Sequence, residues 1–266
     1  MSTVSDYYNQ NPAREWQRLE THVFEWATTM RYLERFLPPS QDILDLGGGP
    51  GRYALALTRA GHRVTLADLA EANLRFAQCK SEEQHTPLAA YVQADARNLA
   101  LFPDQRFDAV LALGPMYHLL EEADRRKAVW ECLRVVKPGG LIALAFISSY
   151  APLYDAVLPD PACLAEWRPR LQHYMVDGTH HAPAVGGTFT DAWFVDPFDI
   201  GPWMSEFPVE PLCLIGAESM LAQSKYSLYA EPPHILDEWI QFACDTAHTA
   251  AALAGSEHLV YFGRKR

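Results

Sequence analysis

Apolar side chains recur at alternating spacings of three and four residues near the start of the chain. This is the period of one face of a helix. Asn11-Pro12 is typical of a helix start and Pro38-Pro39 of a helix end. The pattern predicts a helical segment over residues 1–40 that packs on a core, with charged residues such as Glu15 and Arg18 pointing outward. The apolar positions are Trp16, Leu19, Val23, Trp26, Met30, Leu33 and Leu37.

From residue 42 onward, short apolar runs alternate with helical periods. Such a strand–helix alternation predicts an α/β fold, with a mostly parallel sheet and helices on both of its faces. Residues 192–194 are expected to return the chain to the sheet. Two further strands are expected at 212–215 and 258–263, with a helical excursion at 235–251 between them. The strands expected in the first part are 42–46, 63–67, 88–92, 107–113 and 141–147, and a helix is expected at 121–136.

Residues 149–190 interrupt this alternation, because they are spaced by prolines and rich in aromatic residues and histidine. An insertion after the fifth strand lies at the ligand edge of such a sheet, so we expect it to form a cap over a site. The adjacent His180 and His181 would point opposite ways on an extended segment, and no metal site is predicted. The chain then divides into a helical segment (1–40), a core (41–148), a cap (149–190) and the remainder of the sheet (191–266).

Composition and charge narrow the class of protein. The 266 residues are 49% hydrophobic and carry a formal net charge of −11, which argues against a nucleic-acid partner. The five cysteines are scattered without a C-x-x-C pair, as expected for buried thiols rather than disulfides or metal ligands. No signal peptide or long apolar run is visible. We therefore expect a cytoplasmic protein without a membrane partner, and the oligomeric state stays open.

The sequence places its strongest chemical signal between the first strand and the following helix, where Asp45 precedes the run Gly47-Gly48-Gly49-Pro50-Gly51. A glycine turn between strand and helix brings backbone N–H groups against a ligand. A dinucleotide fingerprint needs a third glycine where Arg52 stands, and a P-loop needs a Gly-Lys-Ser/Thr that is absent. About twenty residues later, Asp68 ends the second strand, where an acid can bind both ribose hydroxyls.

An acid two residues before Gly47-x-Gly49-x-Gly51 resembles motif I of the Rossmann-like S-adenosylmethionine (SAM) methyltransferases. Residues 133–140 (Leu-Arg-Val-Val-Lys-Pro-Gly-Gly) resemble the segment before strand five of that family. Tyr7-Tyr8, residues 15–19, 114–119 and 256–265 are similar to a bacterial group of small-molecule methyltransferases. The resemblance implies a seven-stranded sheet of order 3-2-1-4-5-7-6 with strand seven antiparallel.

The resemblance also implies which residues hold SAM. The glycine loop would hold its aminocarboxypropyl end, Asp68 its ribose, and Asp95 with Ala96 its adenine. The full set of expected cofactor contacts is Tyr7, Asp45, Gly47, Gly48, Gly49, Asp68, Leu69, Asp95, Ala96, Leu113 and Gly114.

The expected catalytic residues are His118, Tyr117 and Tyr8. Imidazole is suited to accept a proton near neutral pH. Related phosphobase methyltransferases pair a histidine after strand four with a tyrosine of the N-terminal segment, which here implies His118 with Tyr7 or Tyr8. The alternative is that Tyr117 and His118 only pack the start of the next helix.

Together these features predict SAM-dependent methyl transfer to a small molecule by in-line displacement. A non-catalytic SAM-binding regulatory protein is one alternative, and a nucleic-acid or protein methyltransferase is another. A nucleic-acid N-methyltransferase is expected to carry an Asn/Asp-Pro-Pro-Tyr-like run, where this chain has Gly-Pro-Met-Tyr at 114–117. A nicotinamide oxidoreductase is disfavoured by Arg52 and by the Pro-Gly-Gly at 138–140.

Overall fold

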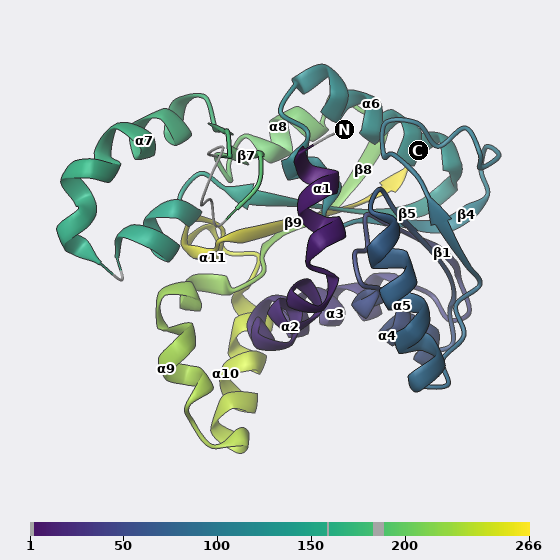
Figure 1. Cartoon of the computed structure of the whole chain (residues 1–266), viewed down its shortest axis with the longest axis horizontal. Coiled ribbons are helices and arrows are strands. Elements are labelled where there is room, and N and C mark those ends of the chain that lie inside the picture. Colours follow the sequence, from purple (N-terminus) through teal and green to yellow (C-terminus); the bar gives the residue numbers. More distant parts are fainter. Residues whose placement is uncertain (1–2, 159, 183–188) are drawn as a thin grey trace.

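The computed structural model of the chain describes residues 3–158, 160–182 and 189–266 (Figure 1). Its centre is a sheet in which β1 (Asp42–Leu46) lies between β2 (Arg63–Asp68) and β4 (Phe107–Ala112). The strand β3 (Ala90–Gln93) pairs with β2, and all of these pairings are parallel. The helices α4 (Arg52–Arg59) and α5 (Glu71–Glu83) connect the strands. The predicted order of the first four strands is therefore confirmed.

The second half of the sheet carries the antiparallel strand. The helix α6 (Glu122–Val135) leads into β5 (Val136–Ser148), which pairs in parallel with β4. The last strand, β9 (His258–Lys265), runs antiparallel between β5 and β8 (Val209–Gly216). The order β3-β2-β1-β4-β5-β9-β8 is the expected 3-2-1-4-5-7-6 with the seventh strand antiparallel.

The described residues form nine strands rather than the predicted seven. The two additional strands are β6 (Thr179–His180) and β7 (Ala192–Val195), which pair with each other. Beyond the end of β4, β7 also pairs in parallel with the last residues of β5. A two-residue strand has no periodicity of its own, and β7 is placed by a pairing distant in sequence. Residues 192–194 return to the sheet as predicted, but the sequence pattern could not reveal which strands β6 and β7 pair with.

The N-terminal segment folds into three helices, α1 (Thr3–Gln10), α2 (Pro12–Thr21) and α3 (Val23–Phe36), instead of one. Pro12 occupies the first turn of α2 as predicted. The chain leaves helical geometry at His22, whose φ and ψ are −89° and 65°. The expected apolar face still packs on the core, with Leu33 fully buried.

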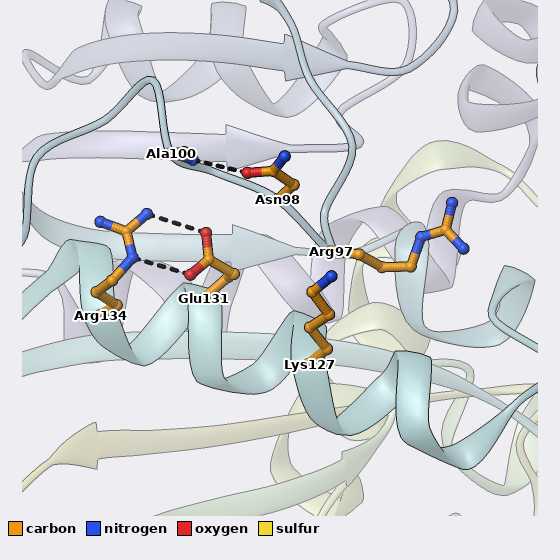
Figure 2. Close-up of a pocket in the computed structure, with 6 residues that line it drawn as sticks. All are labelled: Arg97, Asn98, Ala100, Lys127, Glu131 and Arg134. Atoms are coloured by element: carbon orange, nitrogen blue, oxygen red, sulfur yellow. Dashed lines mark hydrogen bonds and ion pairs between the residues drawn. The ribbon is translucent and has the colours of Figure 1, made fainter.

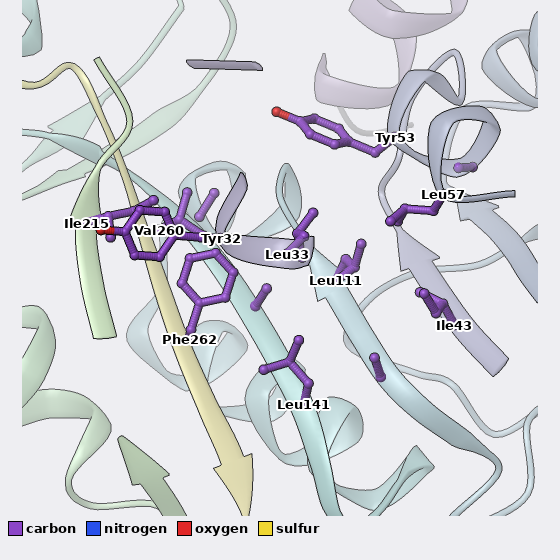
Figure 3. Packing of buried hydrophobic residues seen from close by; sticks show 14 of the residues in the cluster. Tyr32, Leu33, Ile43, Tyr53, Leu57, Leu111, Leu141, Ile215, Val260 and Phe262 are labelled. Carbon is purple, nitrogen blue, oxygen red and sulfur yellow. The ribbon is translucent and has the colours of Figure 1, made fainter. Parts of the chain in front are cut away.

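Alternate residues of the strands belong to two apolar clusters, one on each face of the sheet. Ile43 and Leu111 belong to the cluster beneath α3 and α4, together with Leu33 and Phe262 (Figure 3). Their neighbours along the strands belong to the cluster on the opposite face. This alternation follows from the period of two in a strand. It buries the centre of the sheet on both sides, so the exposed chemistry is confined to the sheet's edges.

The remaining elements surround the sheet. In Figure 1, α7 (Leu164–Val176) extends from one end of the molecule, while α9 (Lys225–Tyr229) and α10 (Pro233–Thr246) form another projection. In the described ranges, no helix combines the length and the apolar character needed to span a bilayer. The short elements are η1 (Pro115–His118), η2 (Leu153–Val157), η3 (Pro161–Cys163), α8 (Ile200–Met204), η4 (Ser219–Ser224) and α11 (Ala250–Gly255).

Candidate active site

The glycine loop after β1 has a backbone that only glycine adopts without strain. Gly47 and Gly49 have φ values of 64° and 57°, in the left-handed region. A Cβ on Gly47 would lie 2.5 Å from the ring of Pro115, and one on Gly48 would lie 2.4 Å from Oδ2 of Asp45. The loop is thus held between η1 and Asp45, and its backbone forms a cradle with no room for a side chain at Gly47 or Gly48.

Asp45 lies beneath this cradle and is fully buried. Neither of its carboxylate oxygens has a side-chain hydrogen-bond partner among the described residues. Burial, together with the nearby charge of Asp68, raises the pKa of Asp45 to about 7, against a backbone hydrogen bond from Ala54. A buried carboxylate without a charged partner is costly, and its position beneath the glycine loop suits a cationic ligand group.

Asp68 ends β2 beside the same loop. Its Oδ2 accepts a hydrogen bond from the Gly49 N–H at 2.8 Å, and its Oδ1 accepts one from the Ala70 N–H at 2.8 Å and a longer one from Asn73. Burial raises the pKa of Asp68 against these donors. The carboxylate therefore fixes both the loop and the turn before α5. Carboxylate oxygens accept more than one hydrogen bond each, so ribose binding is compatible with this role.

The predicted adenine residue, Asp95, is engaged by a neighbouring arginine. The Arg97 guanidinium donates to both of its oxygens, through Nε at 3.0 Å and Nη2 at 2.7 Å, and also reaches Asp124 at 2.7 Å. Burial would raise the pKa of Asp95, but these bonds to Arg97 hold it below the ordinary value. Ala96 is buried, and Leu69 is half-buried.

The loop after β4 meets the glycine loop. A Cβ on Gly114 would lie 2.9 Å from the carbonyl oxygen of Gly47. Leu113 and Gly114 are half-buried at this junction. The contact brings η1, which ends in His118, to the side of the cradle.

His118 forms the predicted pair with Tyr8, not with Tyr7. The Tyr8 hydroxyl lies 2.8 Å from Nε2 of His118, and Nδ1 lies 2.9 Å from the carbonyl oxygen of Asp191. A carbonyl only accepts, so Nδ1 carries the proton and the Tyr8 hydroxyl donates to Nε2. Burial lowers the pKa of His118 to about 4 and raises that of Tyr8 well above its ordinary value. Both side chains are neutral at physiological pH.

Three further aromatic rings surround the pair. The ring of Tyr117 lies 4.7 Å from that of His118, and Phe189 lies 5.8 Å away on the other side. The ring of Tyr7 packs edge-on against Tyr8 at 5.2 Å. Phe189 belongs to the predicted cap, of which residues 159 and 183–188 lie outside the described residues. The end of the insertion therefore contacts the candidate catalytic histidine.

The prediction that Glu15 and Arg18 point outward is wrong. Their side chains are 18% and 31% exposed and form an ion pair at 2.8 Å. A Cβ on Gly49 would lie 4.0 Å from Cγ of Glu15, so the pair covers the glycine loop. A helical period identifies the face toward the core, but it cannot show that the opposite face covers a loop from elsewhere in the chain.

A second concave region lies between the β3–β4 connection and α6. Figure 2 shows that Arg134 is paired with Glu131 there, while Arg97, Asn98 and Lys127 line the rest. None of the expected cofactor or catalytic residues lines this pocket. We therefore place the candidate active site at the glycine loop and His118.

Comparison with known proteins matches the part of the chain that contains the glycine loop and His118. Residues 43–140 match the family described as a methyltransferase domain. A ubiquinone biosynthesis O-methyltransferase of Maricaulis maris is 33% identical over 131 residues, covering 49% of this chain and 50% of that protein. A tRNA (carboxymethyluridine(34)-5-O)-methyltransferase of Arabidopsis thaliana is 29% identical over 155 residues, covering 58% and 34%. The chain thus spans about half the length, or less, of these curated relatives.

The fold comparison extends further along the chain. A SAM-dependent methyltransferase structure from Methanosarcina mazei superposes with a TM-score of 0.59 at 18% identity, covering 88% of this chain and 96% of that one. The matched domain, the relatives and the superposed structure make this chain similar to the class I, Rossmann-like SAM-dependent methyltransferases. The cofactor of this class is SAM, which becomes S-adenosylhomocysteine when its methyl group is transferred.

Proposed function

We propose that this protein transfers the methyl group of SAM to a small-molecule acceptor by in-line displacement, with the acceptor beneath the insertion at 149–190. The observation that carries this proposal is the neutral Tyr8–His118 pair beside the glycine cradle. A pure SAM-binding regulator would need the cradle but not a buried hydroxyl–imidazole pair.

The residues around the loop suit SAM. The buried carboxyl group of Asp45 lies beneath the cradle without a side-chain hydrogen-bond partner among the described residues, and SAM carries an ammonium and a sulfonium. Bound SAM supplies an electrophilic methyl group. The loop glycines would accept its aminocarboxypropyl end, and Asp68 would bind the ribose. Asp95 would reach the adenine while remaining bound to Arg97. The other proposed contacts are Tyr7, Leu69, Ala96, Leu113 and Gly114.

His118 and Tyr8 would handle the acceptor's proton. The Tyr8 oxygen would accept it while the hydroxyl proton moves to Nε2 of His118, and the Nδ1–H bond to the Asp191 carbonyl would hold the resulting imidazolium. Burial lowers the pKa of His118 to about 4, so the imidazole is a weak base. A weak base favours acceptors whose proton is acidic, such as a phenol or an enol. The O-methyltransferase relative supports an oxygen acceptor.

The direct test incubates the protein with SAM and small-molecule extracts and searches by mass spectrometry for a gain of one methyl group. Calorimetry with SAM, S-adenosylhomocysteine and NAD tests the cofactor independently. Transfer RNA forms the competing arm, because one relative acts on tRNA; the net charge of −11 argues against it. SAM binding without any methylated product would favour the regulatory alternative, and methylation of tRNA alone would overturn the proposed acceptor class.

A further inference from the structure

A cluster of buried charges lies at the same edge of the sheet as the candidate active site. Because β9 is antiparallel, its first residue, His258, lies at the carboxyl edge of the parallel strands, opposite Ile147 near the end of β5. This places His258 on the edge that carries the glycine loop. Nothing in the proposed reaction uses it.

His258 is held between two carboxylates. Its Nδ1 lies 2.7 Å from Oε1 of Glu218 and 3.8 Å from Oε2 of Glu25, and the three side chains are 15%, 2% and 12% exposed. The other oxygen of Glu218 accepts backbone N–H bonds from Glu257 and His258, at 3.1 and 3.0 Å. Glu218 is therefore fixed in place, and His258 bridges it to α3.

From Glu25 the contacts continue to the glycine loop. Nη1 of Arg18 lies 3.3 Å from Oε2 of Glu25, and Arg18 in turn pairs with Glu15 at 2.8 Å. Glu15 is the residue that covers Gly49. Arg18 is also near enough to Tyr8 and Tyr117 to influence their pKa values. One chain of ionic contacts thus connects β9 with the N-terminal helices above the site.

The charges that face His258 come from four elements. Arg18 is on α2, and Glu25 is on α3 beside His22, whose Nδ1 lies 3.3 Å from the same Glu25 oxygen. Glu218 precedes η4. Lys225, at the start of α9, binds both oxygens of the adjacent Glu257 at 2.7 and 2.6 Å. With Glu15, which also pairs with Arg18, four carboxylates (15, 25, 218 and 257) thus face Arg18, Lys225 and a protonated His258.

Burial lowers the pKa of His258, but Glu25 and Glu218 outweigh it and raise that pKa to about 9. Two overlapping sets of residues in this cluster, His22–Glu25–Glu218 and Glu218–Glu257–His258, have the spacing of a metal site. Each of them already has an ionic or hydrogen-bond partner, and two cationic side chains border the cluster. An ion-pair network accounts for the arrangement without a metal.

We propose that His258 is a positioning residue: its imidazolium joins Glu218 to Glu25 and so holds the N-terminal helices, with Glu15 and Tyr8, over the glycine loop. We call His258, Glu25 and Glu218 the latch. The catalytic consequence of this inference rests on the proposed function, but the latch itself can be tested without any substrate.

The test measures hydrogen exchange of the substrate-free protein in His258→Gln, which keeps a donor but removes the charge. Amides of residues 3–21 should exchange at least about tenfold faster than in the wild type, while those of β1 and β4 stay unchanged. The SAM dissociation constant should rise by about tenfold. His62→Gln is the matched control, because His62 is a half-buried histidine that accepts a hydrogen bond from the Gln41 N–H and has no carboxylate partner.

The pH profile separates a charged latch from a merely structural histidine. The pKa of His258 in the folded protein lies above the ordinary histidine value of 6.5. Its stabilising contribution is therefore complete below pH 6.5 and is lost as the pH rises through about 9. The hydrogen-exchange protection of residues 3–21, corrected for the intrinsic exchange rate, should therefore fall between pH 6.5 and about 9 in the wild type. It should not change with pH in His258→Gln. If His258→Gln does not fold, the neutral pair Glu218→Gln/His258→Gln replaces it.

Unchanged exchange of residues 3–21 in a folded variant would overturn the proposal. So would a stoichiometric metal in the purified protein that the variant lacks. If exchange responds as expected but no methyl transfer is found, the latch stands and the proposed function fails.

Discussion

The carboxyl group of Asp45 should make the folded protein less stable as the pH rises toward neutrality. The unfolded chain releases this proton near the ordinary pKa of 3.8, and the folded protein near about 7. Between these values the folded state binds more protons than the unfolded state, so the free energy of unfolding falls with rising pH. The difference corresponds to about 4 kcal/mol.

Asp45→Asn removes this titration while keeping the shape of the side chain. Urea unfolding across this pH range should show that the wild type loses stability relative to the variant by about 4 kcal/mol. SAM affinity should respond in the opposite sense. If the ionised carboxylate binds the SAM ammonium, wild-type affinity should rise by up to about tenfold per pH unit below the folded pKa. The affinity of Asp45→Asn should be lower at neutral pH and independent of pH.

Asp42, at the opposite end of β1 from Asp45, provides the control for this prediction. Asp42 is paired with Arg63 and Arg106; burial would raise its pKa, but these partners hold it below the ordinary value. Its contribution to stability is present at neutral pH and lost in acid, so Asp42→Asn should change the pH profile with the opposite sign. Parallel unfolding profiles for the wild type and Asp45→Asn would refute the reasoning about Asp45.

Three further predictions concern the cofactor, the base and the cap. Asp68→Ala should weaken SAM binding by at least about tenfold, since two charge-assisted hydrogen bonds are worth about 1.5–3 kcal/mol each; unchanged calorimetric affinity in a folded variant would reject the ribose assignment. His118→Ala should keep SAM affinity but lower turnover by about 10²–10⁴-fold. Wild-type turnover should not decline as the pH falls through 6.5, because the pKa of His118 is about 4. Near-normal turnover of the variant would mean that His118 only lines the pocket. Hydrogen exchange of the cap residues 160–182 should slow when product and acceptor are both bound. Protection that is already maximal without these ligands would mean that the cap is rigid and does not order on binding.

The order of the main strands could be predicted because each strand carries a local signal. Buried runs such as 107–113 are bounded by turn residues, and the glycine loop marks the first strand. The break at His22 had no such signal, since the apolar spacing continues across it with Val23 and Trp26. The pairing of β7 with β5 depends on residues about fifty positions apart, and nothing in either segment specifies it alone.

The candidate site divides in the same way. The resemblance identified His118, but the choice between Tyr7 and Tyr8 needed the geometry of α1 relative to η1. Periodicity places Glu15 outward because it describes a helix against its own core, and it carries no information on a loop that folds beneath the helix. The link from Glu25 to His258 spans most of the chain, so only the folded structure reveals it.

The buried carboxyl groups at this edge differ in whether a cation faces them. Glu218 is buried and the Glu25 side chain is only 12% exposed, yet His258 holds the pKa of each below its ordinary value, with Arg18 adding to the effect on Glu25. Asp45 is fully buried and has the charge of Asp68 rather than a cation near it, and its pKa is raised. Burial is common to all three, so the missing partner explains the difference. A cationic ligand at Asp45 would supply what the protein provides for Glu25 and Glu218, and for this reason we place the charged end of SAM beside Asp45 rather than at the latch.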